Sequence, residues 1–248
     1  MMANNAINYN IESAQFEQAQ TILISLAKVV KNVMLNPYSS GYVRASFWKT
    51  TPQFERTEKN LTITILNASN NEPYEGIPPI SIPQNIIKIK GGPLIGVLNP
   101  KTIYGNDTVL LDKVNASLGA VKVFQSDGAW VTLDYSRARC VYIGCLDIYN
   151  ASGSTYVKYD AIEIIVVNMS LGSFPTSSTG TFQYLITVEN QGVTQNSFVV
   201  SENIKVRAEI DGEAPQELDV SSQEWAQNGQ VLVNVVTITI QISVFEGG

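Results

Sequence analysis

Residues 8–34, NYNIESAQFEQAQTILISLAKVVKNVM, form the long stretch of this sequence that has a helical period. Its apolar residues recur at alternating steps of three and four, which places them on one helix face: Phe16, Ala19, Leu23, Leu26, Val30 and Val33. Asn8 or Asn10 is suited to cap the start, and Asn36-Pro37 ends the helical pattern. We therefore predict one long amphipathic helix at the beginning of the chain.

The chain after this helix has the period of two that is typical of β-strands. Asp127-Gly128 predicts a hairpin turn between two such runs. The last run, residues 230–245, alternates apolar residues with Thr, Gln and Ser and carries no charge, so we expect it at the centre of a sheet or in an assembly interface. The predicted fold is mainly β: one antiparallel β-sandwich, or two in series, preceded by one long N-terminal α-helix.

Three regions follow from this pattern. Residues 1–36 form the N-terminal helix, residues 42–170 a β-sandwich domain, and residues 181–248 a second β region that either stands alone or belongs to the same sandwich. The boundary falls in SLGSFPTSSTG, residues 170–180, which is the most linker-like segment.

The composition excludes several classes of function. The net charge of −6 and the absence of a basic cluster argue against nucleic-acid binding. Charged residues make up only 15%, against about 25% in typical proteins, so the surface is neutral and polar. The chain has no His, which excludes Ser-His-Asp and Cys-His catalysis within it and removes the commonest metal ligand. We therefore expect no cofactor and no metal site.

The two cysteines lie close together in CVYIGC. In a continuous strand Cys140 and Cys145 would be about 16 Å apart, beyond the roughly 7 Å that a disulfide spans between Cα atoms. A disulfide therefore needs a turn or bulge, which Gly144 can provide, and would fit an oxidising compartment. Two buried, unbonded thiols are the alternative.

The N-terminus has neither the basic region nor the apolar stretch of a signal peptide, and the apolar runs are shorter than the ~20 residues of a membrane span. A mature form of a longer protein and an intracellular protein both fit this observation.

Asparagine glycosylation motifs are the strongest functional signal. The chain contains six Asn-X-Ser/Thr tripeptides, at Asn60, Asn67, Asn106, Asn115, Asn150 and Asn168. Composition alone would produce roughly three. Four of the six fall at predicted strand ends or in loops, the exceptions being Asn60 and Asn168. Their use would place the protein outside the cell.

Other polar groups and aromatic residues give weaker signals. Asp134 and Asp147 flank a strand pair, and we interpret them as surface carboxylates rather than as the acid pair of a glycosidase. Asn106-Asp107 and residues 211–213 have oxygen ligands for calcium but lack an EF-hand-like spacing. Trp225, in a polar segment, is the best candidate for a contact residue, for example with a glycan.

Two segments resemble a known family. Residues 12–33, ESAQFEQAQTILISLAKVVKNV, resemble the helix that follows the membrane-spanning part of archaeal type IV pilin-like surface proteins, the group that includes archaellins. Residues 128–140, GAWVTLDYSRARC, are similar to a run in uncharacterised surface-anchored proteins of Crenarchaeota. The resemblance implies an outward-facing, often glycosylated β-sandwich head behind an apolar helix that anchors the subunit or forms a filament core. The processing site and apolar span of that family are absent from this sequence, so it also implies a soluble ectodomain.

These observations predict a non-enzymatic, extracellular structural or adhesive component of an archaeal cell envelope or pilus-like filament. Its expected partners are other envelope or pilin-like subunits and possible glycan ligands, with membrane contact only through an upstream segment. A carbohydrate-binding module or envelope-acting glycosidase, and a self-assembling virion coat subunit, are the alternatives. The helix is expected to pack on the head, with Phe16 exposed near its beginning.

Overall fold

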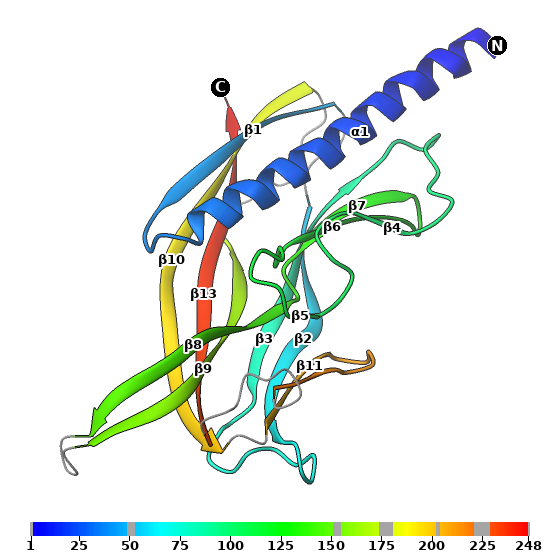
Figure 1. Cartoon of the computed structure of the whole chain (residues 1–248). Coiled ribbons are helices and arrows are strands. Elements are labelled where there is room, and N and C mark those ends of the chain that lie inside the picture. Colours follow the sequence, from blue (N-terminus) through cyan, green and yellow to red (C-terminus); the bar gives the residue numbers. More distant parts are fainter. Residues whose placement is uncertain are drawn as a thin grey trace.

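The computed structural model contains one helix followed by strands that form two sheets (Figure 1). It describes residues 2–48, 53–150, 155–173, 181–201, 204–220 and 229–247. The helix is α1 (Met2–Val33). The strands are β1 (Ser40–Trp48), β2 (Gln53–Asn67), β3 (Ile80–Lys90), β4 (Lys101–Tyr104), β5 (Leu110–Leu111), β6 (Ala120–Gln125), β7 (Ala129–Asp134), β8 (Ala138–Asn150), β9 (Thr155–Leu171), β10 (Thr181–Ser201), β11 (Ile204–Ile210), β12 (Gln216–Asp219) and β13 (Gln230–Gly247).

The predicted mainly β fold with one N-terminal helix is confirmed, but only one of its sheets is antiparallel. Sheet B has the order β12-β11-β2-β3-β7-β6-β4, is antiparallel throughout and curls into a half-barrel. Sheet A has the order β1-β10-β13-β9-β8-β5 and is mixed, because β13 runs parallel to β9 and β5 parallel to β8. The chain leaves sheet A after β10 and passes through β11 and β12 of sheet B. When the chain returns to sheet A as β13, it runs antiparallel to β10 and parallel to β9.

Two of the predicted β features are present as expected. Strand β13 lies between β10 and β9, so the uncharged C-terminal run is central in its sheet, where neither edge is open. Strands β6 and β7 form the hairpin around Asp127-Gly128. Both sheets also combine strands from residues 42–170 and 181–248, so the two β regions share one sandwich.

Two hydrophobic clusters fill the interior, and the long strands contribute to both. In β9, Ile165 and Val167 belong to the first cluster, while Ile164 and Val166 belong to the second. Strand β13 likewise supplies Val231, Val233 and Val235 to the second cluster and Ile238, Ile240, Ile242 and Val244 to the first. Since successive side chains of a strand point to opposite faces, sheet A is covered on both faces, each over part of its length.

Helix α1 covers the first cluster, and the predicted apolar stripe is confirmed. The six residues of the stripe are buried, and Ile22 and Ala27 widen it. The helix packs on β1 and β10 of sheet A and on β6 and β7 of sheet B. Its approach to β1 is close, since a Cβ on Gly41 would lie 2.6 Å from Cγ1 of Val29. A side chain at position 41 would therefore push the helix away.

The C-terminal end of α1 is held by side chains from two other segments. The Asn190 amide, which is buried, donates hydrogen bonds to the carbonyls of Val33 and Asn36, each at 3.2 Å. The Ser39 hydroxyl donates to the Val33 carbonyl at 2.8 Å. A register shift in β10 between Asn190 and Gly192 accompanies this contact. These bonds satisfy carbonyls that a helix end leaves without an intrahelical partner.

The start of the helix and the position of Phe16 differ from the prediction. The helix begins at Met2 rather than at a cap on Asn8 or Asn10. Asparagine is a weak helix former but does not stop a helix, and residues 2–8 contain neither Pro nor Gly. Phe16, expected to be exposed, is buried instead, because a loop of sheet B folds over it at Gly91.

Truncating the centre of the helix stripe tests this core. Leu26 is fully buried, so we expect Leu26→Ala to lower the free energy of unfolding by about 2–5 kcal/mol through lost transfer energy and a residual cavity. Urea denaturation measures the loss. Lys28→Ala, on the exposed face of the same helix turn, is the control and should be close to neutral. Equal effects of the two substitutions would contradict the burial of this stripe.

Candidate functional site

The N-terminal part of α1 projects beyond both sheets (Figure 1). Residues 5–11 are all exposed, and the exposed fractions of Ile7, Tyr9 and Ile11 are 56%, 51% and 41%. With a rise of 1.5 Å per residue, residues 2–11 extend about 15 Å. We call residues 2–11 the helix tip. Within the described part of the chain, no helix combines the length and apolar character of a membrane span.

The loop after β3 makes the last contacts with α1 before the helix tip. The Leu94 backbone N–H donates to Oε2 of Glu12 at 2.8 Å. A Cβ on Gly91 would lie 2.9 Å from the ring of Phe16, so this loop approaches the helix with its backbone. The Gly91-Gly92 turn therefore has a packing role, because a side chain at position 91 would press on the ring of Phe16.

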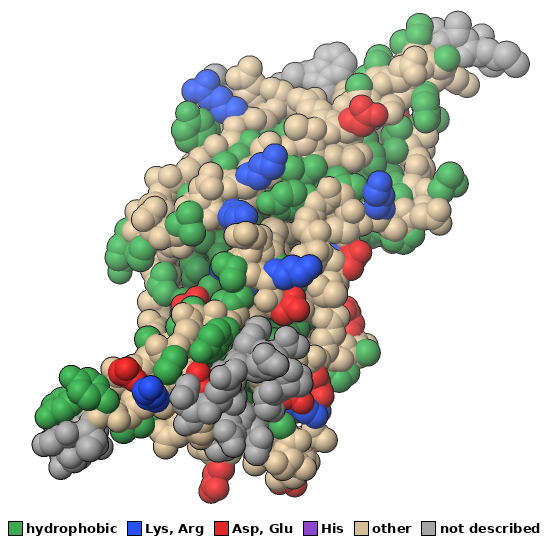
Figure 2. Space-filling model, in the orientation of Figure 1, with side chains coloured by type: hydrophobic (Ala, Val, Ile, Leu, Met, Phe, Trp, Pro, Cys, Tyr) green, Lys and Arg blue, Asp and Glu red, His purple; other side chains and the backbone are tan. Residues whose placement is uncertain are grey.

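At the other end of the molecule, β8 and β9 extend beyond the rest of sheet A (Figure 1). Strand β13 pairs with β9 only from Asp160 onward, and β5 pairs with β8 only at Ala138 and Arg139. Residues 146–150 and 155–159 therefore form a two-stranded ribbon, which we call the β8–β9 arm. Hydrophobic side chains gather at its end (Figure 2). Four of them are exposed: Leu146, Ile148, Tyr149 and Tyr156.

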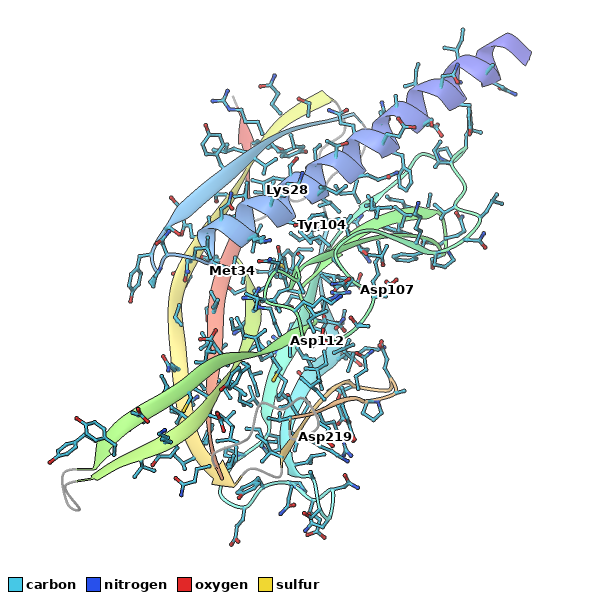
Figure 3. The ribbon with its side chains drawn as sticks, viewed as in Figure 1. Lys28, Met34, Tyr104, Asp107, Asp112 and Asp219 are labelled. Carbon is cyan, nitrogen blue, oxygen red and sulfur yellow. The ribbon has the colours of Figure 1, made fainter. Side chains whose placement is uncertain are left out.

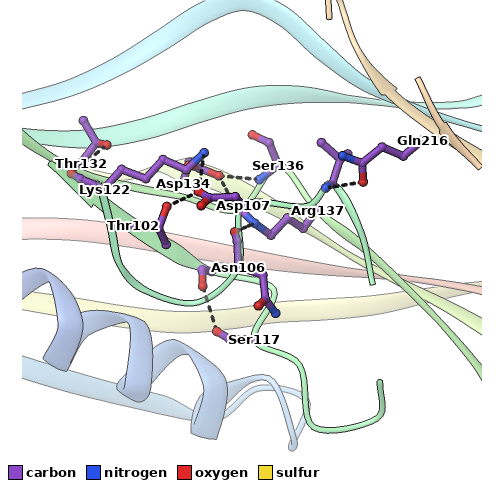
Figure 4. Close-up of polar contacts among 12 residues, drawn as sticks. Thr102, Asn106, Asp107, Ser117, Lys122, Thr132, Asp134, Ser136, Arg137 and Gln216 are labelled. Atoms are coloured by element: carbon purple, nitrogen blue, oxygen red, sulfur yellow. Dashed lines mark hydrogen bonds and ion pairs between the residues drawn. The ribbon is translucent and has the colours of Figure 1, made fainter. Parts of the chain in front are cut away.

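A buried ion pair lies where the chain passes from sheet B to sheet A (Figure 4). Asp134 ends β7, and the Arg137 guanidinium just before β8 donates from Nη1 to its carboxylate. The Nε of Arg137 donates to the Asn106 carbonyl at 2.7 Å, and the Ser136 N–H donates to Asp134 at 3.2 Å. Arg137 is only 2% exposed. Because a buried charge is costly unless it is paired, these contacts hold the segment between β7 and β8 in one conformation. We call this ion pair and its hydrogen bonds the crossover lock.

The structure keeps the two candidate acids apart. Asp134 is engaged by Arg137, whereas Asp147 lies in the β8–β9 arm opposite Lys158. Other carboxylates are also dispersed: Asp107 and Asp219 lie at separate places along the molecule (Figure 3). The interpretation of Asp134 as a surface carboxylate is corrected, because it is buried in the crossover.

The two loops considered for calcium use their carboxylates in protein contacts. Asp211 accepts hydrogen bonds from the backbone N–H and the side-chain amide of Asn60, at 2.9 and 3.1 Å. Glu213 pairs with Lys59 at 3.2 Å, and Asp107 accepts from the Thr102 hydroxyl. Among the described residues there is no group of three or more Cys, Asp or Glu side chains arranged to hold a metal ion.

Neither cysteine is in a disulfide bond. A bulge is present between Tyr142 and Gly144, but β8 continues as a strand through it. Cys140 and Cys145 therefore stay apart along β8, opposite Ile164 and Asp160 of β9. Cys140 is buried and Cys145 is exposed. Burial raises the pKa of the Cys140 thiol to about 12.

Of the tryptophans, Trp130 can be placed in the structure and Trp225 cannot. Trp225, the predicted contact residue, lies outside the described residues. Trp130 is buried on β7, an inner strand of sheet B, and its indole N–H donates to Asp127 at 2.7 Å. The Nζ atoms of Lys88 and Lys90 lie 4.9 and 5.2 Å from its ring centroid. Lys90 and this indole hold the pKa of Asp127 below its usual value. These partners occupy the ring, so Trp130 has a packing role.

The glycosylation motifs differ in accessibility. Asn106 and Asn115 are exposed in loops, and Asn67 is half-buried at the end of β2. Asn150 ends β8, but its side chain is outside the described part. Asn60 and Asn168 are half-buried on strands, and the Asn60 amide already donates to Asp211. The structure therefore leaves Asn106 and Asn115 the most open to modification.

Comparison with known proteins adds no relative: no family model, no curated protein and no solved structure matches this chain.

Two features of these surfaces were missed by sequence reasoning. Residues 137–148 are predicted as strand, and the run CLDIY, residues 145–149, would place apolar side chains on both faces of that strand, with Cys145 and Tyr149 on one face and Leu146 and Ile148 on the other. That signal could have identified the arm. Asn190, by contrast, contacts the helix end from a distance of over 150 residues in sequence, and no local pattern indicates such a contact.

The crossover lock predicts a large loss of stability on removing its cation. Arg137→Leu leaves the Asp134 carboxylate buried without its cation, so we expect the free energy of unfolding to fall by about 3–5 kcal/mol. The matched control is Arg207→Leu, because Arg207 pairs with Glu217 at 2.6 Å but is partly exposed. We expect that change to cost less than about 1 kcal/mol. Urea titrations giving the same loss for both would contradict a buried lock.

The thiols should react very differently. At pH 8 the Cys140 thiol stays protonated because its pKa is about 12, and burial also blocks reagents. We expect a thiol reagent to label one cysteine per native chain and two in urea, with Cys145→Ser abolishing the native reaction. Labelling that requires prior reduction would show that a disulfide forms after all.

Proposed function

We propose that this chain is the non-enzymatic, extracellular head of an archaeal pilin-like or cell-envelope protein, with a structural or adhesive role. The observation that carries the proposal is the division of α1 into two parts. Residues 16–33 bury their apolar stripe in the sandwich, whereas the helix tip leaves Ile7, Tyr9 and Ile11 in solvent. Short helices are stabilised mainly by packing of an apolar face, so the exposed tip fits a contact with a neighbouring subunit.

The direction of the helix supports the same role. The tip points away from both sheets, so another subunit or helix can lie beside it without meeting the head (Figure 1). The last contact of the head is the loop at Gly92 and Leu94 around Glu12. The head thus packs against residues 16–33 of the helix and leaves the helix tip exposed. A subunit that assembles through its helix requires this arrangement.

The surface chemistry supports an extracellular location. Charged residues are few, and the two most exposed glycosylation motifs, Asn106 and Asn115, lie in loops where a bulky glycan disturbs neither sheet. Asn67 is half-buried at the end of β2. Polar, uncharged surfaces bearing such sites are typical of glycosylated envelope proteins rather than of cytosolic ones.

Mass spectrometry of protein from its native source, combined with labelling of intact cells by a membrane-impermeant reagent, tests the proposal. We expect surface labelling and glycopeptides at Asn106 and Asn115, with Asn168 unmodified because it is half-buried in the middle of sheet A. Asn168 serves as the internal control for motif use by accessibility. Unmodified Asn67, Asn106 and Asn115 in a protein protected from the label would overturn the extracellular assignment.

A further inference from the structure

We propose that the β8–β9 arm is a dimerisation element that packs face to face against the arm of a second copy of this chain. The arm extends beyond the rest of sheet A (Figure 1), and among the described residues no third strand pairs with residues 146–150 or 155–159. An isolated two-stranded ribbon is only marginally stable in water. The arm is anchored in sheet A at one end, but beyond Asp160 only its own two-stranded ladder supports it, so a further layer would stabilise it.

The two faces of the arm differ in chemistry. The antiparallel register places Leu146 opposite Tyr159 and Ile148 opposite Val157, so these four side chains share one face. This face carries no charged residue. The other face has Asp147 opposite Lys158 and Tyr149 opposite Tyr156, with the two tyrosine rings 5.3 Å apart between centroids.

The apolar face is still open to solvent. Leu146 is 41% exposed and Ile148 is 43% exposed, while Val157 and Tyr159 are partly covered. A second ribbon on this face, at the roughly 10 Å spacing of packed sheets, would form a small four-stranded, two-layer unit. Such a unit buries the apolar side chains of both ribbons, which neither ribbon can do alone.

A second copy is the occupant that fits the charges. A two-fold axis places each surface against itself, so the uncharged apolar face meets an identical apolar face. Asp147 and Lys158 point the other way and give the arm no net charge, so the copies do not repel at the contact and no charged partner is favoured. Because the arm projects, the two heads stay apart. The helix tip lies at the opposite end, so this inference does not depend on the proposed function.

Sedimentation of the full chain over a range of concentrations tests the proposal. We expect a monomer–dimer equilibrium that Ile148→Asp weakens by about a hundredfold, since the symmetric contact receives the change twice. Ile7→Asp is the matched control: it is the same substitution at an exposed isoleucine of the helix tip, and it should leave the dimer intact. Ile148 lies outside both hydrophobic clusters, so circular dichroism should show that Ile148→Asp is folded.

Three results would overturn the dimer arm. A wild-type chain that stays monomeric at millimolar concentration has no such contact. A dimer weakened by Ile7→Asp and not by Ile148→Asp assembles through its helix tip, which would favour the proposed function but not this arm. A monomer that co-sediments with phosphatidylcholine vesicles, and loses this binding in Ile148→Asp, uses the arm to contact a membrane surface instead.

Discussion

The burial of one face of α1 between the two sheets is the packing interaction on which the fold depends. Leu23, Leu26 and Val30 are fully buried in a cluster that also takes side chains from β7, β9, β10 and β13. Sheet A and sheet B diverge where the helix lies, and it fills the space between them (Figure 1). Without α1, strands central to both sheets would expose their apolar faces to water. The helix is thus part of the sandwich and not an appendage to it.

The crossover at residues 135–137 connects this packing to the rest of the chain. Tyr135 is buried, and its hydroxyl lies 3.4 Å from the Ala27 carbonyl of α1, to which it donates. Burial raises the pKa of Tyr135 well above its usual value, which keeps this donor protonated. Two residues later, Arg137 pairs with Asp134 and contacts the loop at Asn106. Helix, crossover and loop are therefore held at one place by a few buried polar contacts.

Two of the places where the molecule exposes apolar side chains are far apart. The helix tip and the β8–β9 arm lie at opposite ends of the head, and each extends past the element that last supports it (Figure 1). The tip carries no charge over residues 2–11, and the charges of the arm balance. Neither surface selects a charged ligand, and both fit association with other protein subunits. The carboxylates, in contrast, are dispersed or paired.

The sequence by itself determined the elements whose signal is local. The three-to-four spacing of apolar residues identified the buried stripe of α1, and Asp127-Gly128 identified a hairpin, because both depend on neighbours within one turn. Only the tertiary structure decided which strands pair. It made β13 parallel to β9, left the arm without a neighbour, buried Phe16 beneath Gly91 and kept Cys140 apart from Cys145. Each of these outcomes depends on contacts between distant residues or on strand register, which no local spacing encodes.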